Sequence, residues 1–178
     1  MKIYDDSLII VTSDRGQALI DNKFNYYGHN HLLFDELVEV PLMIKLPKNK
    51  KFPVRGGYQS LTKLNKFIVD VIEGNYEEDN ITDEVVYSEI RGIREVEDKD
   101  FYNQQSQTNG KKILDAFADR KAIYKGGYKC VVTGRSGQVE EFTKHGKEVD
   151  SNNILLKDLL TPLQDFSTTA RDDFTINL

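Results

Sequence analysis

Two apolar runs near the start of the chain predict buried strands. Residues 7–12 contain consecutive Leu, Ile and Val side chains without polar alternation. Such a run is typical of a strand covered on both faces, as in the middle of a mostly parallel sheet. Residues 41–47 form a second run with proline at each end, where a strand tolerates it. Between them, residues 31–38 have apolar side chains three and four positions apart, which predicts a short helix.

A longer helix is predicted after a basic, glycine-containing linker at residues 48–57. Ser60 is a suitable N-cap, and Gly74 supplies a stop. The apolar residues between them recur on one face of a helix: Leu61, Leu64, Phe67, Ile68, Val71 and Ile72. Residues 84–90 then predict a strand, and the polar residues 91–112 predict a loop.

The second half of the chain predicts a three-stranded antiparallel meander. Residues 121–124 and 128–133 flank Gly126 and Gly127, a dipeptide suited to the positive φ of a hairpin turn. A further turn leads into a third strand at residues 138–142. The apolar residues that follow have helical spacing, although Pro162 interrupts it: Leu155, Leu156, Leu159, Leu160 and Leu163.

Single polar residues in this region are interpreted from their neighbours. Lys125 and Lys129 alternate with apolar residues, as on an exposed strand face. Cys130 is the only cysteine and lies in a strand-like run, so it is interpreted as a small buried apolar residue and not as a nucleophile. His145 lies among polar residues and is interpreted as a surface side chain.

Length and charge narrow the class of protein. A chain of 178 residues with 39% hydrophobic content favours a single domain with one core. The net charge is −5, with acids and bases mixed along the chain, so nucleic acids are unfavourable partners. Asp5 and Asp6 stand where a secretory signal would need an apolar core, and no apolar run approaches about 20 residues. We therefore expect no membrane partner and a cytoplasmic location.

The candidate chemistry lies just after the first predicted strand. In an open α/β sheet, functional side chains gather where strands end, and Asp14 and Arg15 occupy that place. The polar stretch 17–30 that follows is long for a connection in a compact domain. Loops of that length are often functional.

The order of these segments resembles the C-terminal part of the sulfatase family within the alkaline phosphatase superfamily. Four motifs carry the resemblance, in the family's order and spacing: the strand and loop Asp5-Asp6-Ser7-Leu8-Ile9-Ile10-Val11-Thr12-Ser13-Asp14-Arg15-Gly16, then Tyr27-Gly28-His29, then Leu33-Phe34-Asp35-Glu36, then Val40-Pro41-Leu42-Met43-Ile44. Ser88-Glu89, Ala122-Ile123 and Gly127-Tyr128-Lys129-Cys130-Val131 match later family segments.

The resemblance covers nearly the whole chain and implies an α/β fold. It implies a partial alkaline-phosphatase-like sheet with flanking helices, followed by a small C-terminal antiparallel sheet. The whole chain, 1–178, would be one sulfatase-like C-terminal domain. Within it, residues 1–90 would be the remnant of the central sheet with the site loop, and residues 113–178 the meander and C-terminal helix.

The resemblance also implies that the catalytic N-terminal half of the family domain is absent. In family enzymes, paired aspartates come earlier, followed by a Cys, Ser or Thr nucleophile in a Cys/Ser-x-Pro-x-Arg setting. Both would lie upstream of Met1. Asp5 and Asp6 precede the strand and do not replace the paired aspartates. Pro53-Val54-Arg55 has Lys51 where the nucleophile would stand.

The metal site implied by the family is incomplete in this chain. Family enzymes bind a divalent cation such as calcium, and Asp14 matches their aspartate ligand. Arg15 departs from the family's His or Asn, and a guanidinium has no lone pair to donate to a metal. One carboxylate falls short of the roughly six oxygen ligands of calcium, so we expect no cofactor for this chain.

Each site residue also has an alternative interpretation. Asp14 could instead cap the loop or pair with Arg15, and Arg15 could bind a sulfate or phosphate oxyanion or be a solvated charge. His29 matches the family's Gly-His histidine, which would make it a catalytic candidate, or it could be a half-buried loop histidine. His31 is less well matched and is interpreted as structural.

Three functional hypotheses follow from these residues. The chain could be a sulfatase-like C-terminal portion that is not catalytic alone. It could be half of a split sulfate- or phosphate-ester hydrolase, completed by an N-terminal half on another chain. It could also be a binding module that uses Arg15 and His29 to hold an anionic ester or a partner protein. Exposed sheet edges would help a partner, or a second copy of the chain, to dock.

Overall fold

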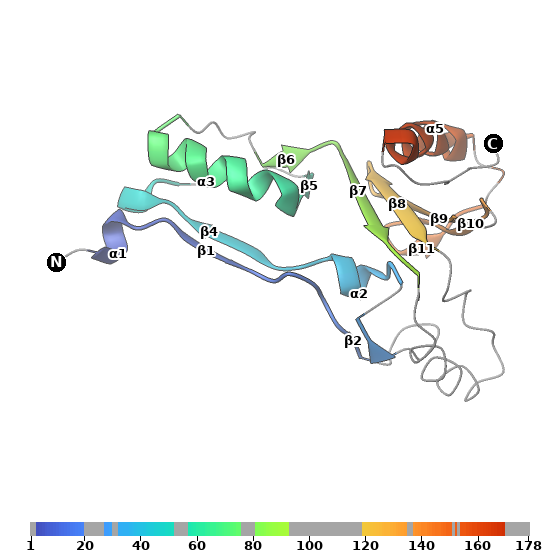
Figure 1. The fold of residues 1–178 in the computed structure, drawn as a ribbon, viewed down its shortest axis with the longest axis horizontal. Coiled ribbons are helices and arrows are strands. Elements are labelled where there is room, and N and C mark those ends of the chain that lie inside the picture. The colour runs from blue at the N-terminus through green and yellow to red at the C-terminus, as the bar shows by residue number, and fades with distance from the viewer. Residues whose placement is uncertain are drawn as a thin grey trace. The chain divides into compact units, whose positions relative to one another are not determined.

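The chain has a mixed α/β fold with several antiparallel sheets (Figure 1). The computed structural model describes residues 3–19, 27–29, 32–51, 57–75, 81–92, 119–134, 137–150, 152 and 154–169. The chain forms two compact units, the first from residues 1–14 and 40–86 and the second from residues 15–39 and 87–178.

The first unit is built on two antiparallel strands, β1 (Ile9–Thr12) and β4 (Leu42–Lys45). Both strands lie where the apolar runs predict them. We expected the first strand to have parallel neighbours and to be buried on both faces. Both expectations are wrong for the residues that the structure describes. β1 pairs antiparallel with β4, and Val11 and its cross-strand neighbour Met43 are 48% and 60% exposed.

The covered face of this pair packs on the long helix of the first unit (Figure 1). Phe67 of the helix is fully buried against Ile10 and Ile44 of the strands. The helix consists of η2 (Leu61–Lys63) and α3 (Leu64–Glu73). Ser60 accepts a hydrogen bond from the Thr62 amide, and Gly74 ends the helix in the left-handed region, which confirms both predicted helix ends.

Short elements complete the first unit. Lys45 donates hydrogen bonds to the carbonyls of Tyr4, Asp5 and Ser7, and so caps the C-terminal end of the first helix. Lys63 pairs with Asp83. The remaining elements are α1 (Ile3–Asp6), η1 (Pro47–Asn49), β5 (Tyr58–Gln59) and β6 (Thr82–Asp83), and β5 pairs with β6.

A five-stranded sheet in the order β11-β10-β9-β8-β7 is the centre of the second unit. It contains the predicted meander, which is confirmed, and it is larger than predicted because one strand joins at each edge. The boundary between the two units falls within β7. The strands are β7 (Val85–Ile90), β8 (Arg120–Lys125), β9 (Tyr128–Thr133), β10 (Val139–Lys144) and β11 (Lys147–Glu148).

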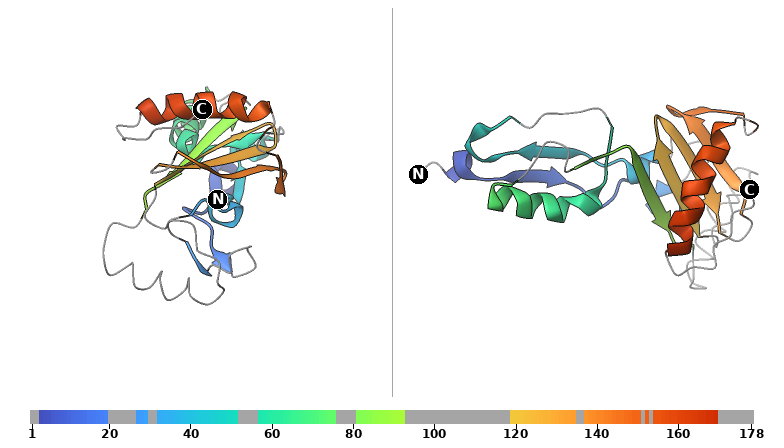
Figure 2. Two further views of the ribbon diagram at one scale, coloured as in Figure 1. Left: turned by 90° about the vertical axis from the view of Figure 1, so that its right-hand side faces the viewer. Right: turned by 90° about the horizontal axis from the view of Figure 1, so that it is seen from above.

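Helices α5 (Leu155–Thr169) and α2 (Asp35–Val38) pack on this sheet. α5 crosses one face of the sheet (Figure 2). There the centroid of the Phe166 ring lies 5.3 Å from the Lys121 ammonium. The predicted interruption at Pro162 is wrong, because the helix continues through it. The predicted helix at residues 31–38 begins only at Asp35, and residues 32–34 are non-helical and buried.

No helix in the described residues is long and apolar enough to cross a membrane.

Candidate functional site

Asp14 and Arg15 lie directly after β1, at the boundary of the two units. Asp14 ends the first unit, and its side chain is exposed. Arg15 begins the second unit and is also exposed. Its Nη1 donates to the Gln17 side-chain oxygen at 3.3 Å and to the Gly16 carbonyl at 3.5 Å. The guanidinium is therefore held close to its own loop while part of it faces solvent.

A short hairpin brings His29 to the loop that carries Arg15. β2 (Ala18–Leu19) pairs antiparallel with β3 (Tyr27–Gly28), with Ala18 opposite Gly28. Gln17 and His29 are the next residues at the same end of this ladder. His29 is half-buried. The structure thus brings two predicted site residues, Arg15 and His29, to one end of a hairpin in the second unit, whereas His31 lies outside the described residues.

Backbone contact fixes this loop against α2. The Gly16 amide donates to the Leu37 carbonyl at 2.9 Å. A Cβ added at Gly16 would lie 1.9 Å from the Glu36 carbonyl oxygen, so no side chain fits there without a shift of the backbone. Arg15 is therefore attached to α2 through its neighbouring glycine.

A buried ammonium in turn anchors α2 to the sheet. Lys129 of β9 is 4% exposed, and its Nζ lies 2.7 Å from Asp35 and 3.2 Å from Glu141. The prediction that Lys129 lies on an exposed strand face is wrong, because residues 32–38 cover that face. Lys125 is exposed as predicted. We call Lys129, Asp35 and Glu141 the Lys129 triad. The sequence does not predict this triad, although Asp35 and Lys129 both lie in segments that match the family.

The environment of the triad also affects a tyrosine. Burial raises the pKa of the Tyr124 hydroxyl, and the nearby carboxylates of Asp35, Glu141 and Glu39 raise this pKa further. The Lys129 ammonium lies 5.9 Å from the Tyr124 ring centroid. Tyr124 therefore stays protonated at neutral pH, as a hydroxyl beside an ion-paired lysine.

A second buried ion pair lies on the same sheet. Arg120 is 1% exposed, and its forked donors contact both oxygens of Glu140 at 2.8 and 3.0 Å. The register of β10 shifts between Val139 and Glu141, so Glu140 is the extra residue of a bulge. This bidentate pair is a structural contact within the sheet.

The residues of the predicted metal position do not fit a calcium site. Asp14 is an exposed carboxylate followed by the Arg15 guanidinium, which repels cations. Among the described residues, we find no group of three or more His, Cys, Asp or Glu side chains that could hold a metal. Among the described residues, Asp14 is thus the one carboxylate at the predicted metal position.

Comparison of the chain with protein-family models, with curated proteins and with solved structures gave no match.

Proposed function

We propose that the chain is the C-terminal portion of a sulfatase-like protein and that it does not catalyse ester hydrolysis by itself. The observation that carries this proposal is the order of four family motifs along the first 44 residues. A partial alkaline-phosphatase-like sheet, represented by β1, β4 and α3, is the finer fold that the proposal implies.

Two structural features support the proposal. Asp14 lies two residues after the end of β1, and its exposed carboxylate is accessible to a ligand. The Asp35–Lys129 ion pair joins the Leu-Phe-Asp-Glu and Gly-Tyr-Lys motifs across 94 residues of sequence. The two motif segments therefore lie against each other within the second unit.

The expected inactivity follows from the groups that the sequence lacks. No proline in the 178 residues has Cys, Ser or Thr two positions before it, so the family's nucleophile motif is absent. Arg15 replaces a metal ligand of the family with a cation. Neither group that would form and stabilise a covalent sulfate or phosphate ester is present on this chain.

The direct test is hydrolysis of 4-nitrophenyl sulfate and 4-nitrophenyl phosphate by the purified chain, with and without added calcium. We expect no release of nitrophenol above the buffer blank. The Arg15→His variant restores the family residue and should remain inactive, because the nucleophile is still missing. Turnover that copurifies with the chain and is abolished by Asp14→Asn would overturn the proposal.

Anion binding is a second candidate function, favoured by the position of Arg15. Its exposed guanidinium shares one hairpin end with Gln17 and the half-buried His29, and all three side chains can donate hydrogen bonds to an oxyanion. Titration calorimetry with sodium sulfate should show saturable binding that Arg15→Ala abolishes. Lys51→Ala, which removes an exposed cation of the first unit, is the control and should leave binding unchanged.

A further inference from the structure

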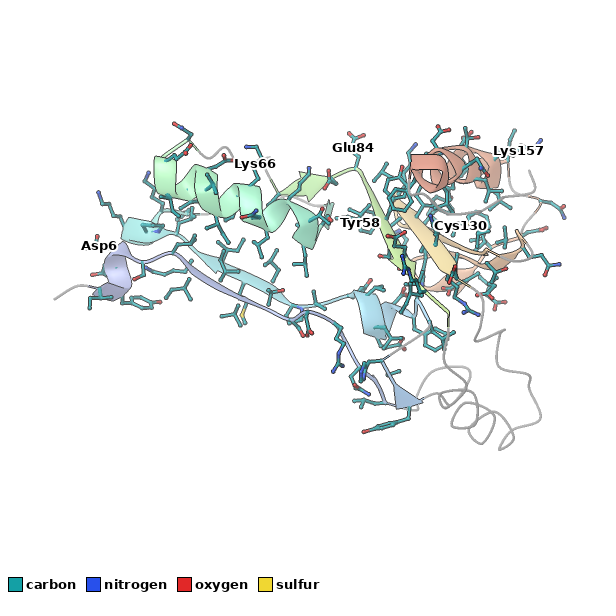
Figure 3. The ribbon with its side chains drawn as sticks, in the orientation of Figure 1. Asp6, Tyr58, Lys66, Glu84, Cys130 and Lys157 are labelled. Atoms are coloured by element: carbon teal, nitrogen blue, oxygen red, sulfur yellow. The ribbon has the colours of Figure 1, made fainter. Side chains whose placement is uncertain are left out.

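One side of α3 carries two exposed aliphatic side chains next to each other. Val69 is 45% exposed and Ile72 is 76% exposed, and residues three positions apart are neighbours on a helix surface. Neither belongs to the core in which Phe67 packs against β1 and β4. An exposed charge lies on the helix surface beside them at Lys66 (Figure 3) and at Glu73. We define the outer face of α3 as Lys66, Val69, Ile72 and Glu73.

The two charges of the outer face are placed symmetrically. Residues seven positions apart lie on nearly one line along a helix, so Lys66 and Glu73 occupy the two ends of such a line. The midpoint of this line falls beside Val69. When a second α3 packs antiparallel on the first, with a twofold axis through this midpoint, Lys66 of each copy lies opposite Glu73 of the other. The outer face is therefore complementary to itself in charge.

The charges also select the direction of such a helix pair. In a parallel pair, Lys66 would lie opposite Lys66 and Glu73 opposite Glu73, and both contacts would be repulsive. Within one chain, the Lys66 ammonium lies 2.6 Å from Asp70, and the lysine side chain is still 73% exposed. Asp70 lies on the same side of the helix as Lys66 and Glu73. The ammonium can therefore keep its Asp70 contact while it reaches Glu73 of a second copy.

We propose that the outer face of α3 is a docking surface for a second copy of this chain, with the two α3 helices antiparallel. Val69 and Ile72 of both copies form the apolar centre of the contact, and two Lys66–Glu73 ion pairs flank it. One face of a three-turn helix buries less than the roughly 800 Å² per partner of a stable complex. The dimer is therefore weak, and its population rises with protein concentration.

The test is sedimentation velocity of the full 178-residue chain over a series of concentrations. Lys66→Glu places like charges opposite each other at both contacts, and Glu73→Lys does the same with the opposite sign. We expect each substitution to weaken self-association roughly tenfold. The combined variant Lys66→Glu/Glu73→Lys restores opposite charges at both contacts and should self-associate as tightly as the unchanged chain.

A mixture of the two single variants gives a second readout. A pair made of one Lys66→Glu chain and one Glu73→Lys chain has opposite charges at both contacts. The equimolar mixture should therefore associate more tightly than either variant alone, which a purely structural effect of the substitutions would not produce. Lys51→Glu makes the same change of charge outside α3 and is the matched control, which should leave self-association nearly unchanged.

The apolar centre is tested by Val69→Ala/Ile72→Ala. Alanine has the higher helix propensity, so this variant should keep its helical circular dichroism while its self-association weakens. A chain that stays monomeric up to its solubility limit would overturn the second copy as the occupant. Self-association that none of these substitutions changes would assign the contact to another surface and overturn α3 as its site. A combined charge variant as weak as the single ones would overturn the antiparallel pairing.

Discussion

At the scale of single residues, Gly16 is the position where side-chain volume matters most for the candidate site. The Glu36 carbonyl occupies the space of a Cβ, and the Gly16 amide is bonded to α2. We predict that Gly16→Ala destabilises the second unit by about 3 kcal/mol, the upper range for an overpacked site, because backbone must move. Chemical denaturation measures this loss.

The neighbouring residue provides the control for that substitution. Gln17→Ala shortens a partly exposed side chain and should change the free energy of unfolding by less than about 0.5 kcal/mol. If Gly16→Ala were as stable as Gln17→Ala, the close approach of the loop to α2 would be contradicted.

Cys130 is fully buried in β9, as predicted for a small apolar residue (Figure 3). Burial raises the pKa of its thiol to about 12, and the Glu141 carboxylate contributes to the same shift. We therefore predict that the native chain does not react with a disulfide reagent such as DTNB at pH 8, whereas the urea-unfolded chain reacts fully. Rapid reaction of the native chain would show that β9 is accessible.

The same shift predicts how stability depends on pH. An unfolded thiol loses its proton near pH 8.5, while the folded thiol keeps it up to about pH 12. The folded state therefore binds more protons across this window, and the contribution of Cys130 to stability falls as pH rises above about 8.5. Cys130→Ala should make the loss of stability between pH 8 and 10 less steep.

At the scale of elements, the attachment of α2 to the sheet depends on the Lys129 triad. Lys129 is nearly inaccessible, whereas the side chain of Asp35 is 40% exposed and that of Glu141 is 17% exposed. Removing both carboxylates leaves a buried ammonium without either partner, and removing the lysine leaves carboxylates that water can reach. Removal of both carboxylates should therefore lower the free energy of unfolding more than removal of the lysine.

We predict that Asp35→Asn/Glu141→Gln costs about 3–5 kcal/mol, the range for a buried charge deprived of its partner. Lys129→Met, which keeps the volume of the side chain, should cost less. The free energies of unfolding of the two variants and of the triple variant measure the coupling. A lysine substitution that is costlier than loss of both acids would contradict the buried position of the ammonium.

Local signals explain which elements the sequence predicts well. The helix of the first unit follows from Ser60, the apolar spacing and Gly74, all within one short segment. The β8–β9 hairpin follows from Gly126 and Gly127, which both have positive φ. In each case the residues that specify the element are also its neighbours in space, so periodicity and turn chemistry are sufficient.

Contacts between distant segments explain what the sequence does not predict. Lys129 looks exposed by alternation, and only its contact with Asp35, 94 residues earlier, shows that it is buried. The antiparallel pairing of β1 and β4 likewise cannot be read from two apolar runs. For the candidate site, position after a strand predicts Asp14 and Arg15, which stay candidates, but the contact of Gly16 with α2 depends on backbone geometry that the residue pattern does not encode.

At the scale of the whole molecule, two compact units alternate along one chain. The backbone passes between them after residues 14, 39 and 86. Phe67, which is fully buried, belongs to the core of the first unit, and Leu163, also fully buried, belongs to the second. The length of the chain favours a single domain. In a single cooperative domain, a destabilising substitution should reduce the protection of all core amides from hydrogen exchange to the same extent.

We predict instead that each core stabilises its own unit. Phe67→Ala should cost about 3–5 kcal/mol and speed amide exchange in β1, β4 and α3, with little change in β9 and β10. Leu163→Ala should have the opposite distribution. Hydrogen exchange followed by mass spectrometry resolves these segments. Equal loss of protection in both units from either substitution would show that the alternating chain couples them into a single cooperative domain.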